Sequence, residues 1–253
     1  MTIADLSVAT FAAIAAVTLL AGFVKGAVGF AMPMIMMSGL TAFLPHETAL
    51  ALLILPTLVT NTAQAFRDGP DAAWNSIRDY RWHIGAVVVF LCLSAQFVHA
   101  LPDRWMAALL GVPVLAFALW QLAGLPLAIP LRHRRRAEIG LGVIGGLYGG
   151  VSGIWGPPLL VYLLSVGARK AEAVRVQGVV FLIGAAALIP AHLASGVLNR
   201  ATLPLSVAAV MPAMLGLWAG FRAHDRLDQT RFRRWTLVLL ALTGGNLVRQ
   251  ALS

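Results

Sequence analysis

Apolar runs follow one another along almost the whole chain and are separated only by short polar segments. A helix rises 1.5 Å per residue, so about 20 apolar residues cross a bilayer core of about 30 Å. Six runs have about 17 to 22 residues and are predicted to span the bilayer. They are residues 48–66, 83–101, 104–125, 173–194, 202–221 and 235–251. A seventh run, 6–24, is also long enough. The pattern predicts an all-α, polytopic integral membrane protein.

Composition supports this class and excludes others. The chain is 59% hydrophobic and 11% charged, whereas a globular protein averages roughly 45–50% and 25%. A net charge of +9 does not indicate nucleic acid, because basic residues of a polytopic protein first hold its cytoplasmic loops in place. A single cysteine, Cys92, excludes an intrachain disulfide. We read no removable signal peptide at the start.

A glycine and proline pattern occurs twice, 124 residues apart. The matched positions are Gly22, Gly26, Gly29 and Pro33 in the first copy and Gly146, Gly150, Gly153 and Pro157 in the second. The apolar runs on either side of the second copy, 139–151 and 154–166, are too short to span alone, which favours broken or re-entrant helices. We therefore predict a first membrane repeat at 1–125, a basic linker at 126–137 and a second repeat at 138–253.

The positions of Lys and Arg predict how the repeats are oriented. If each motif region is a hairpin followed by three spanning helices, 14 basic residues lie on one face and three, Arg104, Arg200 and Arg249, lie on the other. Single crossings at the motifs would give 8 against 9. The hairpin arrangement predicts two inverted repeats, each a glycine-broken hairpin plus three transmembrane helices. It also predicts an inner-membrane location, cytoplasmic basic loops and both termini outside.

The glycine-rich segments 22–33 and 145–158, the chain length and the two-half layout resemble the sulfite exporter TauE/SafE family of membrane permeases. The resemblance covers essentially the whole chain. It implies transport of sulfur-containing anions such as sulfite or sulfonates. One departure is Ala31-Met32, where many relatives carry further glycines. If those glycines let the backbone approach a substrate, the first motif binds it less closely than the second.

The motif residues predict a binding site for an anion near the middle of the membrane. Glycine allows positive φ and close approach of a ligand, and proline suits the first turn of a helix. Two short helices would then point their N-termini, with partial positive charge, at a common cavity. The predicted substrate-binding residues of the motifs are Gly26, Gly29, Pro33, Gly149, Gly150, Ser152, Gly153, Gly156 and Pro157. The alternative is that the glycines only allow close helix packing. Trp155 is either a wall of the site or an interfacial anchor.

Five further polar residues are candidates for the substrate pathway. Lys25 could neutralise an anion, or lie at the end of its helix and extend to water. Arg175 could attract anions, or form a local pair near the interface. Asn61, Gln64 and Gln177 could line the pathway, although amides in membrane helices often bond to a neighbouring helix.

All ten acidic residues fall at predicted segment ends, so a carboxylate proton relay or a charged sodium site is not supported. His192, near a helix end, reads as interfacial rather than as a proton carrier. No intramembrane-enzyme motif is present, and no catalytic residue, metal site or cofactor is predicted. Together with the resemblance, these observations predict a permease that exports its substrate, with a small anion and the bilayer as partners. The alternative is a non-transporting scaffold or assembly subunit. Oligomeric state is left open.

Overall fold

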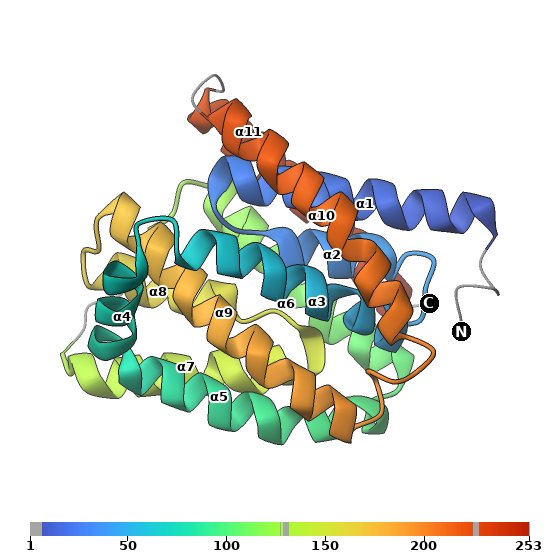
Figure 1. Ribbon diagram of the computed structural model, residues 1–253, viewed down its shortest axis with the longest axis horizontal. Coiled ribbons are helices and arrows are strands. Elements are labelled where there is room, and N and C mark those ends of the chain that lie inside the picture. Colours follow the sequence, from blue (N-terminus) through green and yellow to red (C-terminus); the bar gives the residue numbers. More distant parts are fainter. Residues whose placement is uncertain (1–6, 127, 129–131, 225–227, 253) are drawn as a thin grey trace. The chain divides into compact units, whose positions relative to one another are not determined.

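The computed structural model describes residues 7–126, 128, 132–224 and 228–252 (Figure 1). The described residues form helices and connecting segments, with no strand among them. The helices are α1 Val8–Val28, α2 Met32–Leu40, α3 His46–Ala65, α4 Pro70–Asp79, α5 Arg81–Ser94 with the 3₁₀ turn η2 Ala95–Ala100, α6 Asp103–Leu122, α7 Arg134–Ser152, α8 Gly156–Ser165, α9 Lys170–Ala194, α10 Leu203–His224 and α11 Gln229–Leu252. The predicted all-α class is confirmed.

Six helical segments of the described chain are long and apolar enough to cross a membrane. They are Val8–Ala27, His46–Ala65, Arg81–Ala100, Arg104–Leu122, Glu172–Ala194 and Leu203–Ala223. Five of the six predicted spans and the first run are among them. The run at 235–251 lies in α11, which is not among them; this helix carries Arg231, Arg233, Arg234 and Arg249. Membrane crossing by α11 remains a prediction.

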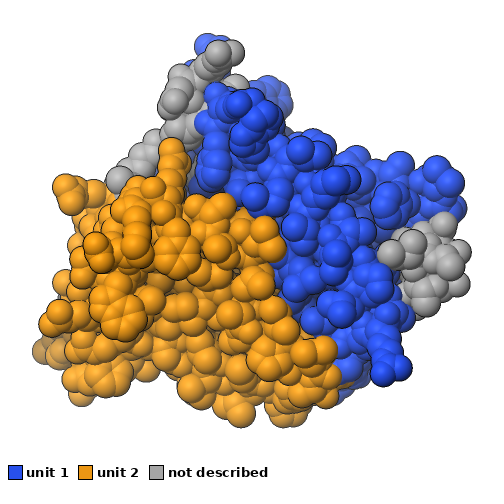
Figure 2. Space-filling model, viewed as in Figure 1, with its two compact units in different colours: residues 1–56, 99–125, 196–253 blue, residues 57–98, 126–195 orange. Residues whose placement is uncertain are grey.

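The chain divides into two compact units (Figure 2). Unit 1 consists of Met1–Pro56, His99–Leu125 and Gly196–Ser253, and unit 2 of Thr57–Val98 and Pro126–Ser195. Each unit takes segments from both halves of the sequence, and one boundary falls at Pro56 inside α3. The two repeats and their inversion remain predictions. The predicted linker at 126–137 lies partly outside the described residues.

In unit 1, α1 packs along α10, and α6 packs along α11. Glycines let the α1 and α10 backbones touch: a Cβ on Gly26 would collide with the carbonyl oxygen of Leu217, and one on Gly220 with that of Phe23. Gly22 contacts the main chain of Ala213 in the same way. Small residues at this spacing let membrane helices pack closely. Short helix α2 packs beside α1 and α11.

In unit 2, α7 packs along α5 in a similar way (Figure 1). Cβ atoms on Gly142, Gly146 and Gly150 would press against the carbonyl oxygens of His83, Val87 and Leu91 respectively. The three glycines are four residues apart and so share one face of α7. A buried Ser94 hydroxyl also donates to the Gly146 carbonyl oxygen, 3.1 Å away. Helix α9 packs against α5 and, through its N-terminal part, against α4.

Candidate functional site

The first helix break lies in unit 1 at the predicted position. Helix α1 ends at Val28 and is capped by Gly29, whose φ of 87° is in the left-handed region and whose N–H donates to the Lys25 carbonyl oxygen at 2.7 Å. Helix α2 follows after two residues, with Pro33 in its first turn. Left-handed backbone suits glycine because it has no Cβ. The break therefore follows from local residue chemistry.

Lys25 lies one turn before this break, and its side chain is only 2% exposed. It is the one buried lysine or arginine among residues whose exposure the structure describes. The alternative predicted for Lys25, extension to water from the end of its helix, does not agree with this burial. An ammonium in the hydrocarbon region costs about 2.5–3.5 kcal/mol on insertion scales. Such a cost is typical of a functional position.

Ala31, between the two helices of this break, has a φ of 76°. An L-residue in the left-handed region costs about 1–2 kcal/mol, and glycine would remove the strain. We expect Ala31→Gly to stabilise the protein by about 1 kcal/mol, measured as a higher unfolding temperature in detergent. The control is Ala27→Gly, inside α1, which should destabilise by about 0.5–1 kcal/mol. Equal shifts in both variants would contradict this interpretation of the φ angle.

The second break lies in unit 2, again at the predicted position. Helix α7 ends at Gly153, whose φ is 69°, and α8 begins at Gly156 with Pro157 in its first turn. The Ser152 hydroxyl donates to the Tyr148 carbonyl oxygen at 2.6 Å and accepts from the Ile154 N–H at 3.1 Å. Ser152 therefore stabilises the turn. To donate to a substrate, as predicted, the Ser152 hydroxyl would have to break its bond to the Tyr148 carbonyl oxygen.

Trp155 fills the space behind this break. The side chain is 2% exposed within unit 2, which does not agree with an interfacial anchor; a role as a wall of the site remains a prediction. Its ring lies edge-on to Phe181, with ring centroids 5.9 Å apart, and Gly149 and Gly184 leave room for it. The buried indole N–H has no hydrogen-bond partner among the described residues. A buried donor without a partner is costly, so this N–H is a candidate contact for an acceptor.

The motif glycines have packing roles in the structure. Gly26 contacts α10 and Gly150 contacts α5, which agrees with the alternative that these residues serve close helix packing. Gly149 faces Trp155, and a Cβ on Gly156 would lie 3.2 Å from the Phe181 ring. Direct substrate contact by these residues, and by Pro33, remains a prediction.

The helix N-termini differ in the donors they offer. Pro157 and the following Pro158 lack N–H groups, which removes two donors from the first turn of α8. The first turn of α2 contains one proline, Pro33, and therefore loses one N–H donor. Because free N–H groups form the anion site at a helix N-terminus, the predicted site depends on α2 more than on α8.

The other predicted polar residues lie in unit 2, and two of them have clear structural partners. Gln64 donates to the Val174 carbonyl oxygen at 2.9 Å and so joins α3 to α9. Arg175 donates to the Ser76 hydroxyl at 3.1 Å and lies 3.6 Å from the Asp68 carboxylate. These contacts agree with the alternatives named for the two residues, and a role for them in the substrate pathway remains a prediction.

Asn61 and Gln177 are buried, at 0% and 5% exposure. Burial is compatible with a pathway or with bonding to a neighbouring helix, so their role remains a prediction.

Two candidates for functional residues could not be predicted from the sequence. Glu138 and His83 were placed at segment ends, but both are buried in unit 2 and hydrogen-bonded to each other. One signal was available: Glu138 lies four residues before Gly142, on the face of α7 that carries Gly142, Gly146 and Gly150. A carboxylate on the packed face of a helix is buried when that helix docks.

Six apolar helices and two helix breaks lined by glycine and proline describe a multi-pass membrane protein. The model of the sulfite exporter TauE/SafE family matches residues 14–247. The chain therefore belongs to that family, whose members are membrane transporters rather than enzymes. No curated protein and no solved structure matches the chain.

Proposed function

We propose that this transporter moves small sulfur-containing anions, such as sulfite or a sulfonate, outward across the cytoplasmic membrane. The observation that carries this proposal is the buried Lys25 side chain, one turn before the break between α1 and α2. A buried positive charge attracts an anion and is stabilised by it, because Coulomb attraction is strong where the dielectric constant is low. The family supports the chemical class.

Two further features support the location and direction. Helix α2 begins seven residues after Lys25, and helix N-termini favour anions. Outward movement of an anion is favoured by the inside-negative potential, at about 2.3 kcal/mol per charge per 100 mV. Export therefore needs no separate energy source.

The test is flux into or out of proteoliposomes for sulfite, sulfate, ethanesulfonate and thiosulfate. We expect saturable flux of at least one, lowered about tenfold or more in Lys25→Met, since a lost contact of 1.4 kcal/mol is tenfold. Methionine keeps the length and removes the charge, and thermal unfolding in detergent should show that the variant is folded. Arg249→Met, at an exposed position, is the matched control and should keep normal flux.

Two outcomes would contradict the proposal. Flux of none of the four anions above empty liposomes would reject the substrate class. Normal flux in Lys25→Met would reject Lys25 as the substrate contact, because the folded variant would then transport without a charge at this position.

A further inference from the structure

A cluster of polar side chains lies inside unit 2, where α5, α7 and α9 begin and α4 and α8 end. Glu138 of α7 is 6% exposed and is the one buried acidic side chain among residues whose exposure the structure describes; His83 of α5 is 0% exposed. The His83 backbone N–H donates to Glu138 Oε1 at 3.2 Å, and the Tyr162 hydroxyl donates to Oε2 at 3.2 Å. Neither donor is charged. The carboxylate is therefore held by neutral groups.

The tautomer of His83 follows from its surroundings. Nδ1 lies 3.1 Å from the Glu138 main-chain carbonyl oxygen, and a carbonyl oxygen only accepts, so Nδ1 carries the hydrogen. The imidazole stacks on the Tyr162 ring, with centroids 5.9 Å apart and an interplanar angle of 10°. Nε2 is buried with no hydrogen-bond partner among the described residues. This nitrogen therefore keeps a lone pair that can accept a proton.

The cluster extends from the buried histidine to the surface. The exposed Arg134 hydrogen-bonds to Tyr162. The Tyr80 ring lies edge-on to Tyr162, and its hydroxyl donates to Glu172 of α9 at 3.0 Å. Burial, together with the bond to Glu172, raises the pKa of Tyr80 above its usual range, so this hydroxyl stays a donor. Arg134, Glu138, Tyr162, Tyr80 and Glu172 are the charged and titratable groups around His83.

Unit 1 contains a similar helix contact without any of this chemistry. Gly22 and Gly26 touch α10 at Ala213 and Leu217, as Gly146 and Gly150 touch α5 at Val87 and Leu91. Equivalent glycines of the two contacts are 124 residues apart in the sequence, and the residues that they touch are 126 residues apart.

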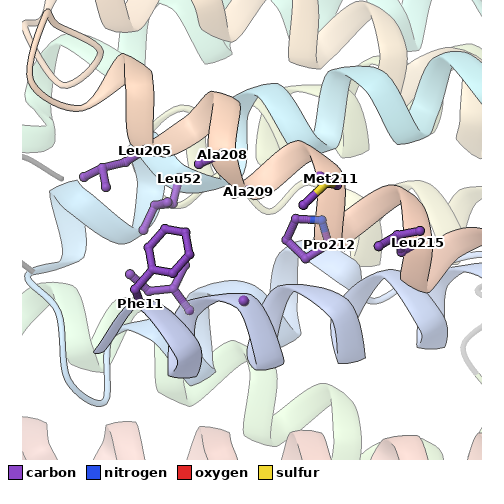
Figure 3. A pocket seen from close by; sticks show the side chains of 10 residues that line it. Phe11, Leu52, Leu205, Ala208, Ala209, Met211, Pro212 and Leu215 are labelled. Carbon is purple, nitrogen blue, oxygen red and sulfur yellow. The ribbon is translucent and has the colours of Figure 1, made fainter. Parts of the chain in front are cut away.

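With these two offsets, the position in α1 that corresponds to Glu138 is Ile14, and the position in α10 that corresponds to His83 is Ala209. Both of these residues line an apolar pocket in unit 1 (Figure 3). Packing of a glycine-lined helix pair in this chain therefore does not require the polar cluster. Because buried polar groups cost free energy that apolar residues avoid, the cluster points to a function.

We propose that His83 and Glu138 form a proton-binding site that makes transport depend on pH; the transport part rests on the proposed function. One proton from water binds to Nε2 of His83, and the Glu138 carboxylate offsets the charge of the imidazolium. When His83 releases this proton, the proton returns to water and the imidazole is neutral again. Imidazole is the side chain whose charge changes most readily near neutral pH.

The geometry links this proton to the rest of unit 2. A proton on Nε2 creates a buried N–H donor with no acceptor, so protonation favours a conformation in which Nε2 reaches water or an anion. Such a change loosens the α5–α7 contact at its Glu138 end. The same face of α7 continues through Gly150 to the break at Gly153. The proton therefore acts on the helix that ends at the second motif.

The first test is histidine NMR on the full-length protein in detergent micelles, labelled with ¹⁵N-histidine. The His83 signal is identified by its loss in His83→Gln. We expect it to titrate reversibly within the pH range in which the protein stays folded and to shift its midpoint in Glu138→Gln. A His83 signal that keeps one protonation state wherever the protein is folded would overturn the proposal. The NMR experiment needs no substrate, so its result does not depend on whether the flux experiment succeeds.

The second test measures flux of the transported anion against pH. We expect the rate in the wild type to change about fivefold or more across the pH range in which the His83 signal titrates, and the profile to flatten in His83→Gln and Glu138→Gln. A double variant with the unit 1 residues, Glu138→Ile with His83→Ala, should fold and transport without pH dependence. The control, His99→Gln, changes an exposed histidine of unit 1. Unchanged pH profiles in both single variants, or a double variant that fails to fold, would overturn the proposal.

Discussion

Replacing Gly150 with alanine will separate α7 from α5 and destabilise the protein by about 3 kcal/mol. A Cβ at this position would collide with the carbonyl oxygen of Leu91 and lie 2.7 Å from the backbone nitrogen of Ala95. Both are main-chain atoms, which cannot rotate away as a side chain can. Since 1 kcal/mol corresponds to roughly 2–4 °C in a chain of this size, the unfolding temperature in detergent should fall by roughly 6–12 °C.

Gly140→Ala is the matched control, because Gly140 lies in the same helix and its surroundings leave open space within 4 Å of where a Cβ would be. Alanine inside a helix is favoured over glycine by about 0.5–1 kcal/mol, so this variant should match or exceed the wild type. If the two variants unfold at the same temperature, close backbone contact is not what stabilises α5 against α7.

The helix breaks could be predicted from sequence because their causes are local. Gly29 and Gly153 take the positive φ that ends each helix, and Pro33 and Pro157 start the next one. The prolines cannot extend a preceding helix without losing a hydrogen bond. A glycine and proline spacing that occurs twice therefore contains the information needed to place both breaks.

The packing partners could not be predicted in the same way. Glycines at 22 and 26 indicate a close contact, and glycines at 216 and 220 are visible in the sequence, but spacing does not say which helices meet. The α1–α10 pair joins segments almost 200 residues apart along the chain. For this reason, two halves divided by sequence do not coincide with the two compact units.

The Glu138 cluster was missed because its local sequence is misleading. Glu138 follows three arginines, Arg134 to Arg136, and such a segment predicts a solvated loop. Helix α7 instead begins at Arg134, which places Glu138 one turn inside the helix. Burial then depends on α5 and α8, whose positions no local pattern contains. Arg175 and Gln64 have tertiary partners of the same kind.

A leucine at Gly153 will reduce anion flux about tenfold or more while the protein remains folded. The φ of 69° costs an L-residue about 1–2 kcal/mol, and the backbone can relieve this strain only by changing the turn. That turn sets the direction of α8 and the position of Trp155, the residue directly before this helix. The predicted substrate contacts of the second motif would therefore move.

Gly167→Leu provides a control with the same strain in a different place. Gly167 has a φ of 70°, lies in the turn between α8 and α9, and has open space where a Cβ would be. Both variants should lose a similar amount of stability in thermal unfolding, because the backbone cost is the same. Only Gly153→Leu should lose flux. Equal flux in the two variants would place the transport pathway away from the second break, whereas loss in Gly153→Leu alone separates a role in transport from a role in folding.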